Sequence, residues 1–142
     1  MERTIYRALY KTFHAMKNNL RPRMVGIGLS PGQPKILEYL MEKNLCMQKE
    51  IAEACDIDPA TVSQILNNME QNGLIRRAIP ENDRRALSIE ITEKGKEMQG
   101  KWEYFRKDAE EIALRGFSQE EREQLTSYLW RAYGNLVNRG LH

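Results

Sequence analysis

Apolar side chains recur every three or four residues along most of the chain, which is the spacing of amphipathic helices. This pattern predicts helices over residues 4–20, about 31–42, 48–54, 59–72 and about 93–115, and a last helix after residue 118. The stretches 74–79 and 86–91 do not follow this helical spacing and are predicted to be strands. In the second of them Leu87, Ile89 and Ile91 alternate with polar residues, as in a half-buried strand. The chain is therefore predicted to be mostly α with one small β-hairpin.

Capping signals define the helix ends. Pro22 and the glycines that follow it are predicted to interrupt the first helix. Ser30 with Gln33 three positions later forms a capping box, which predicts where the second helix starts. Thr92 is predicted to cap the long helix after the hairpin, and a second capping box at Ser118 predicts the start of the last helix.

Two short helices joined by a tight turn precede the hairpin. The first covers 48–54 and carries the small residue Ala52 where a crossing helix would approach closely. Asp58 is predicted to cap the second, because its carboxylate can accept backbone N–H groups and Pro59 suits the first helical position. Gly73 is predicted to end this helix. A helix-turn-helix over about 48–72, followed by a wing over 74–91, is the order of elements in a winged helix-turn-helix lobe that binds DNA.

The second of these helices has an apolar face and an opposite face of short, polar, uncharged side chains. Hydroxyl and carboxamide groups are the ones that pair with base edges in the major groove, since a carboxamide matches adenine and a hydroxyl donates or accepts. A solvated helix face is the alternative interpretation. The residues predicted to contact DNA from this helix are Pro59, Ala60, Thr61, Ser63, Gln64, Asn67 and Asn68.

Two motifs are more specific: Asp83-Arg84-Arg85 at the tip of the wing, and the run Ile-Thr-Glu-Lys-Gly at 91–95. With these motifs the chain resembles the MarR family of transcriptional regulators over nearly its whole length. The resemblance implies that Arg85 enters the minor groove and that Asp83 orients it through an ion pair, while Arg84 contacts phosphate. An ordinary polar turn is the alternative for these residues.

The resemblance also implies how the chain is divided. A single MarR-type domain covers 1–142, with 30–92 as the winged helix-turn-helix lobe and 1–21 and 93–142 as interlocking terminal dimerisation helices. The sequence is consistent with this, because both terminal stretches carry apolar stripes that a monomer would leave exposed. A two-fold homodimer would bind an inverted repeat in double-stranded DNA. The stripe of the last helix comprises Leu125, Leu129, Ala132, Tyr133, Leu136 and Val137.

The charge distribution predicts weak nonspecific binding to DNA. The chain has a net charge of +2, but residues 46–91 hold five basic and eight acidic side chains, a net charge of −3. We therefore expect a shallow dependence of DNA affinity on salt concentration. A winged helix that binds another protein instead of DNA would tolerate this charge better and is kept as an alternative.

Other functions find little support in the sequence. The chain has no glycine-rich phosphate loop, and its two histidines, His14 and His142, lie at opposite ends, so we expect no enzyme, no metal site and no cofactor. Cys46 and Cys55 leave open a redox-responsive regulator, although buried, unreactive thiols are the alternative. No stretch approaches the roughly 20 apolar residues of a membrane span, and without a signal-peptide pattern we expect the protein to be cytoplasmic and not bound to a membrane.

The family often binds small aromatic or phenolic molecules, which suggests an effector pocket lined by aromatic side chains. Core packing is the alternative role for these rings. The expected function is a homodimeric repressor that an effector releases from its operator, although activation stays open because it depends on operator position. The candidate aromatic residues are Tyr6, Tyr10, Phe13, Tyr39, Trp102 and Phe105.

Overall fold

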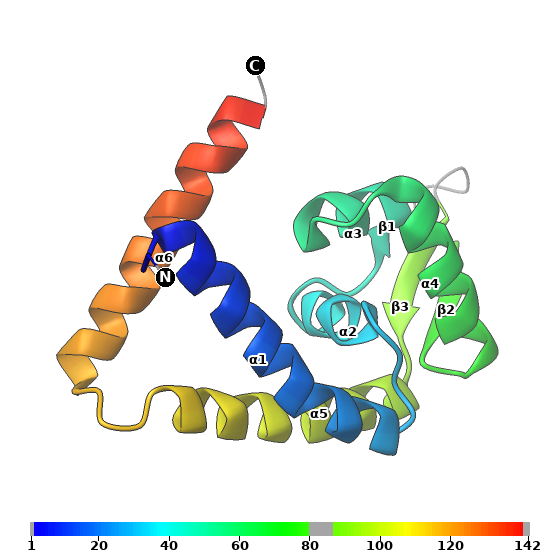
Figure 1. Cartoon of the computed structure of the whole chain (residues 1–142). Coiled ribbons are helices and arrows are strands. Elements are labelled where there is room, and N and C mark those ends of the chain that lie inside the picture. Colours follow the sequence, from blue (N-terminus) through cyan, green and yellow to red (C-terminus); the bar gives the residue numbers. More distant parts are fainter. Residues whose placement is uncertain (1, 80–86, 141–142) are drawn as a thin grey trace. The chain divides into compact units, whose positions relative to one another are not determined.

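The computed structural model describes residues 2–79 and 87–140, with side chains up to residue 138. These residues form two compact units that divide after Lys107, within the fifth helix. The elements in chain order (Figure 1) are α1 (Ile5–Gly26), α2 (Gln33–Glu42), β1 (Cys46–Met47), α3 (Gln48–Cys55), α4 (Pro59–Gln71), β2 (Ile75–Ala78), β3 (Ser88–Ile91), α5 (Glu93–Ala113) and α6 (Gln119–Gly140).

The predicted hairpin is part of a three-stranded antiparallel sheet with the order β1-β3-β2. In β2 and β3, Ile75 lies opposite Ile91 and Ala78 opposite Ser88. The short strand β1 adds Met47 on the other side of Ser88. The winged helix architecture is confirmed, but β1 was not predicted, because two residues are too few to show an alternating pattern.

The core of the first unit lies between α2, α3, α4 and the sheet, which Figure 1 shows grouped together. Each large apolar side chain buried there contributes roughly 1.5–3 kcal/mol to folding. This packing fixes which side of α4 faces the protein and which side stays free. The largest fully buried apolar side chains are Ile36, Leu37, Leu40, Ile51, Val62, Leu66, Met69, Ile75 and Ile89.

One strand prediction was wrong at a single position. Ile89 and Ile91 are buried as predicted, but Leu87 is exposed and the polar Ser88 is buried. Leu87 precedes β3 and pairs with neither neighbouring strand, whereas Ser88 lies in the central strand between two partners. A small side chain fits there.

The first helix runs further than the sequence analysis predicted. It passes through Pro22 and ends at Gly26, because Leu20 and Met24 on either side of the proline are buried. The helix then closes where the glycines predicted an interruption: Gly28 has a φ of 85°, and the N–H of Leu29 donates to the carbonyl of Met24. This is the Schellman geometry, in which a left-handed glycine ends a helix.

The start of α2 also differs from the prediction. The helix begins at Gln33, not at Pro31, because Gly32 has a left-handed conformation with a φ of 86°. Only half of the predicted capping box forms: the Gln33 side-chain oxygen accepts from the N–H of Ser30 at 3.1 Å.

The second unit contains the end of α5 and all of α6. The predicted capping box at the start of α6 is complete, since the Ser118 N–H donates to Glu121 and the Glu121 N–H donates to the Ser118 hydroxyl. Arg122 then bonds Glu111 and the carbonyl of Leu114. Among the helices of the described residues, none combines the length and apolarity that crossing a membrane requires.

Candidate nucleic-acid interface

The start of α4 is held by its predicted cap. The Asp58 carboxylate accepts from the Thr61 N–H at 3.0 Å and from the Thr61 hydroxyl at 2.5 Å. These two bonds, that of the hydroxyl first, hold the pKa of Asp58 below its usual value. Pro59 occupies the first helical position, where its missing N–H costs nothing. The first turn of α4 is therefore well fixed although it is exposed.

One face of α4 points away from the core. Val62, Leu66 and Met69 are fully buried, so the opposite side of the helix is turned to solvent. Of the residues predicted to contact DNA, only Ser63 is half-buried. The exposed ones are Pro59, Ala60, Thr61, Gln64, Asn67 and Asn68.

Three of these side chains already bond within the protein. The Thr61 hydroxyl donates to Asp58, and the side-chain oxygen of Asn67 accepts from Arg77 at 3.1 Å. The side-chain oxygen of Asn68 accepts from both Gln33, at 2.7 Å, and Asn72, at 2.9 Å. The pattern of exposed polar residues alone did not distinguish these engaged groups from free ones.

Ser63 and Gln64 differ from those three. Within the described part of the chain, neither side chain has a hydrogen-bond partner, so both keep their full capacity to donate and accept. They follow Ala60 by three and four residues and lie on the same line along α4. We call this line, which Asn67 continues, the reading face of α4, after the role predicted for it.

Arg77 joins the wing to α4. Its guanidinium lies 2.7 Å from the Glu70 carboxylate and also bonds Asn67, and only 19% of its side chain is exposed. This role was not predicted, because the partners lie seven and ten positions earlier and no periodic pattern in the sequence links a strand to a helix in this way. Arg76, next to it, points outward and pairs with Glu90 across the strands.

The residues predicted to contact DNA from the wing tip are not among those that the structure describes. Asp83, Arg84 and Arg85 lie outside the described residues. Their contacts with the minor groove and with phosphate therefore stay predictions.

The end of α4 is tied to the start of α5. Gly73 closes α4 in a left-handed conformation, and the Leu74 N–H donates to the carbonyl of Met69. The Thr92 hydroxyl donates to the Gly73 carbonyl at 2.5 Å and accepts from the Gly95 N–H at 3.1 Å. The predicted cap at Thr92 is thus formed, and it also holds the last turn of α4.

Both cysteines are buried, Cys46 in β1 and Cys55 at the end of α3. Burial, followed by the nearby Glu50, raises the pKa of the Cys46 thiol to about 11. Burial also raises the pKa of Cys55, whose sulfur lies 3.6 Å from the Lys35 carbonyl oxygen. Since the thiolate is the reactive form, this geometry favours the unreactive interpretation. The described residues hold no cluster of three or more His, Cys, Asp or Glu that suits a metal ion.

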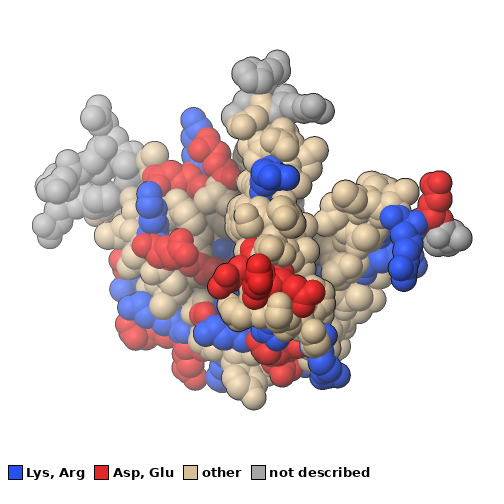
Figure 2. Space-filling model, turned by 90° about the vertical axis from the view of Figure 1, so that its left-hand side faces the viewer, with Lys and Arg blue, Asp and Glu red and all other residues tan. Residues whose placement is uncertain are grey.

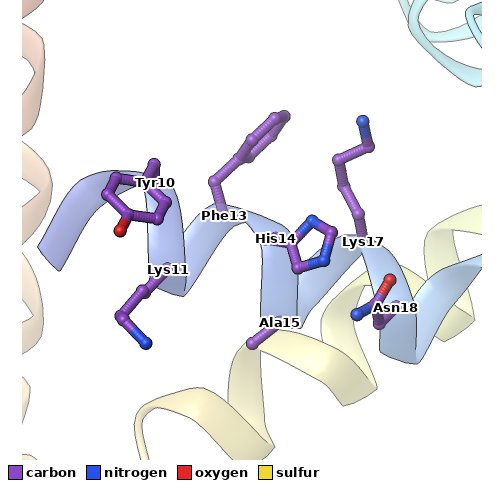
Figure 3. Close-up of a pocket in the computed structure, with 7 residues that line it drawn as sticks. All are labelled: Tyr10, Lys11, Phe13, His14, Ala15, Lys17 and Asn18. Atoms are coloured by element: carbon purple, nitrogen blue, oxygen red, sulfur yellow. The ribbon is translucent and has the colours of Figure 1, made fainter. Parts of the chain in front are cut away.

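The six aromatic side chains considered for an effector pocket lie in different surroundings. Tyr39 and Trp102 pack against the core, whereas Tyr6, Tyr10 and Phe13 are exposed on α1. Figure 3 shows a hollow beside α1 whose described lining comes from this single helix, so that lining cannot enclose a ligand. It comprises Tyr10, Lys11, Phe13, His14, Ala15, Lys17 and Asn18.

The comparisons with known proteins agree with this architecture. The family model described as MarR family matches residues 27–86. The HTH-type transcriptional regulator YybA of Bacillus subtilis is 28% identical over 113 residues, which cover 78% of this chain and 73% of that protein. Two further curated relatives, also transcriptional regulators, match over 48% and 59% of their own length.

Solved structures give the same result over more of the chain. The structure of the transcriptional regulator SlyA superposes with a TM-score of 0.86 at 26% identity, with 95% of both chains covered. A mutant of S. aureus MepR bound to an oligodeoxyribonucleotide is 26% identical, with a TM-score of 0.63 over 95% of this chain and 99% of that one. These relatives are named as transcriptional regulators and not as enzymes, which confirms the expectation that the chain is a regulator and not an enzyme. Residues 27–86 thus match the MarR family of transcriptional regulators, and the chain as a whole is similar to solved structures of such regulators.

Proposed function

We propose that this regulator binds double-stranded DNA in a sequence-specific manner as a homodimer, with α4 in the major groove of each half of an inverted repeat. The observation that carries the proposal is the reading face of α4, on which Gln64 is exposed and unengaged within the described residues. The DNA in the MepR structure supports it by analogy. Repression follows if the operator overlaps a promoter.

The homodimer is supported by the apolar side chains that each terminal helix exposes. On α1, Tyr6 is 79% exposed, and on α6, Leu136 is 70% exposed. Figure 2 shows broad areas of surface without a charged side chain. Large apolar side chains that are exposed along one helix mark an interface. A small aromatic or phenolic effector would release the DNA by binding more tightly to a dimer in which the two α4 helices are wrongly spaced.

The proposal is tested by selecting DNA from a random pool and measuring fluorescence anisotropy at two salt concentrations. The wild type should enrich an inverted repeat. Gln64→Ala should weaken binding to that operator by roughly 1–3 kcal/mol and relax its specificity, because Gln64 contacts a base edge. Arg84→Ala should weaken binding to all sequences about equally, and Arg85→Ala should weaken binding most where the minor groove is narrow.

Gln124→Ala is the matched control, since it makes the same change at an exposed position of α6, outside the winged helix. Its affinity for the operator should equal that of the wild type. A folded, dimeric wild type that enriches no sequence would contradict the proposal and favour the protein-binding alternative. Equal losses for Gln64→Ala on every DNA would contradict the base contact.

A further inference from the structure

The carboxamide of Asn67 is held in one orientation. It contacts Nη2 of Arg77, and a guanidinium group has donors but no acceptor. The atom of Asn67 that faces Arg77 is therefore the oxygen, and the amino group must point the other way. Asn67 is an exposed residue on the reading face, and its amino group lies on the side of the carboxamide that does not face Arg77.

Arg77 itself has little freedom to release that oxygen. Its other terminal nitrogen is 2.7 Å from the Glu70 carboxylate, and charge-assisted bonds of this kind are the strong ones. Its side chain extends from β2 and is four-fifths buried, with 19% exposed. The orientation of Asn67 is thus set by the folded protein before any DNA arrives.

This orientation decides which bases Asn67 can recognise. An asparagine pairs with adenine through both of its groups, since the oxygen accepts from N6 and the amino group donates to N7. Arg77 occupies one acceptor site of the Asn67 oxygen and holds that oxygen towards the wing, so the amino group, a donor, is the part of the carboxamide turned away from Arg77. Guanine presents two acceptors, N7 and O6, in the major groove.

We infer that Asn67 reads guanine and that Arg77, which does not contact the base, is the positioning residue that sets this specificity. The inference rests on the proposed DNA-binding function. The inference also assigns different bases to two neighbouring residues of α4. Gln64, one turn before Asn67, has no described partner on either group of its carboxamide and can still pair with adenine.

Asn68 provides a contrast within the same helix. Its oxygen accepts from Gln33 and Asn72, and the Gln33 amide is itself oriented because its oxygen accepts from the Ser30 N–H. Gln33 is 2% exposed, so this chain of bonds joins the start of α2 to α4 from the inside. Asn68 therefore holds α4 in place, and reading is left to Gln64 and Asn67.

The test uses the full-length protein and its selected operator, with each base pair varied in turn. The base pair that Asn67 contacts is identified with Asn67→Ala: it is the operator position at which this variant no longer prefers one base over the others. The wild type should prefer guanine there over adenine by about tenfold or more. In Arg77→Met, which keeps the packing of the stem but frees the Asn67 oxygen, this preference should fall to about threefold or less, with adenine gaining.

Two controls separate specificity from charge. Arg76→Met removes the same charge from an exposed neighbour on β2 and should leave the base preference unchanged. The position read by Gln64 should keep its preference in Arg77→Met. If Arg77→Met does not melt cooperatively, Glu70→Ala, which removes one of the two bonds that hold Arg77, should reduce the guanine preference in part.

The outcomes are distinguishable. A selected operator whose guanine preference survives in both Arg77→Met and Glu70→Ala would overturn this inference alone. Adenine as the preferred base at the Asn67 position would do the same. A wild type that selects no sequence would overturn the proposed function and this inference with it.

Discussion

Gly95, in the first turn of α5, lies directly against the backbone carbonyl of Leu74, and no space remains between them for a methyl group. A Cβ at this position would overlap that oxygen and also Cγ1 of Ile91. This contact explains why the run at 91–95 ends in glycine. It also makes Gly95 one of the points where the wing is fastened to α5.

Gly95→Ala should therefore destabilise the protein, by at least about 1 kcal/mol, because overpacking against backbone cannot be relieved by a rotamer change. The measurement is urea unfolding at a fixed protein concentration. Gly100→Ala is the control on the same helix, where a Cβ meets nothing within 4 Å. It should stabilise the protein by about 0.5–1 kcal/mol. Equal stabilities of the two variants would contradict the close contact.

The cap of α4 should make stability depend on pH in the acidic range. The pKa of Asp58 is lowered by its bonds to Thr61, so its contribution is complete above the unfolded-state value of about 3.8 and is lost as the pH falls through the folded-state value. Asp58→Asn keeps an acceptor at the cap but does not titrate. The urea midpoint of the wild type relative to Asp58→Asn should therefore decrease between pH 5 and acidic conditions of about pH 2. A difference independent of pH would show that the carboxylate charge does not contribute.

The thiols should resist modification in the folded protein. With the pKa of Cys46 at about 11 and both cysteines buried, almost no thiolate is present near neutral pH. Ellman's reagent at pH 8 should react slowly with the native protein and rapidly with both thiols in guanidinium chloride. Operator affinity should be unchanged after mild hydrogen peroxide. Fast reaction of either thiol in the native state would favour the redox-responsive alternative.

The apolar stripe of α6 should control the oligomeric state. Leu129 is 45% exposed and lies in the middle of this stripe, so Leu129→Glu should convert the proposed homodimer to a monomer and reduce its affinity for the selected operator. The measurement is sedimentation velocity over a range of concentrations. Ser127→Glu places the same charge on the opposite side of the helix and should remain dimeric. A Leu129→Glu protein that sediments like the wild type would exclude this face as the interface.

The parts of the fold that the sequence predicted well are those set by short-range bonds. Asp58 bonds Thr61, Thr92 bonds Gly95, and the capping box at Ser118 is complete, each over three residues. Both partners of such a bond lie within one helical turn of the sequence, and so their spacing is enough to predict the bond.

The features that were missed depend on residues far apart in the chain. β1 exists because Cys46 and Met47 pair with β3, more than 40 positions later. The helix continues through Pro22 because Leu20 and Met24 are buried, which outweighs the loss of one helical hydrogen bond. In the candidate site, the exposed residues of α4 were predicted, but the bond from Arg77 to Asn67 was not, since it joins a strand to a helix.

The bridging hydroxyl of Thr92 has a consequence for how the winged helix opens. It donates to the Gly73 carbonyl after the last turn of α4 and accepts from the Gly95 N–H in the first turn of α5. Fraying at either helix end therefore disturbs the hydroxyl that also bonds the other end. We therefore expect the backbone amides of these two turns to exchange with deuterium at a common rate, as one cooperative unit. In Thr92→Val, which has neither bond, the two turns should exchange independently, while Thr92→Ser should preserve the shared rate.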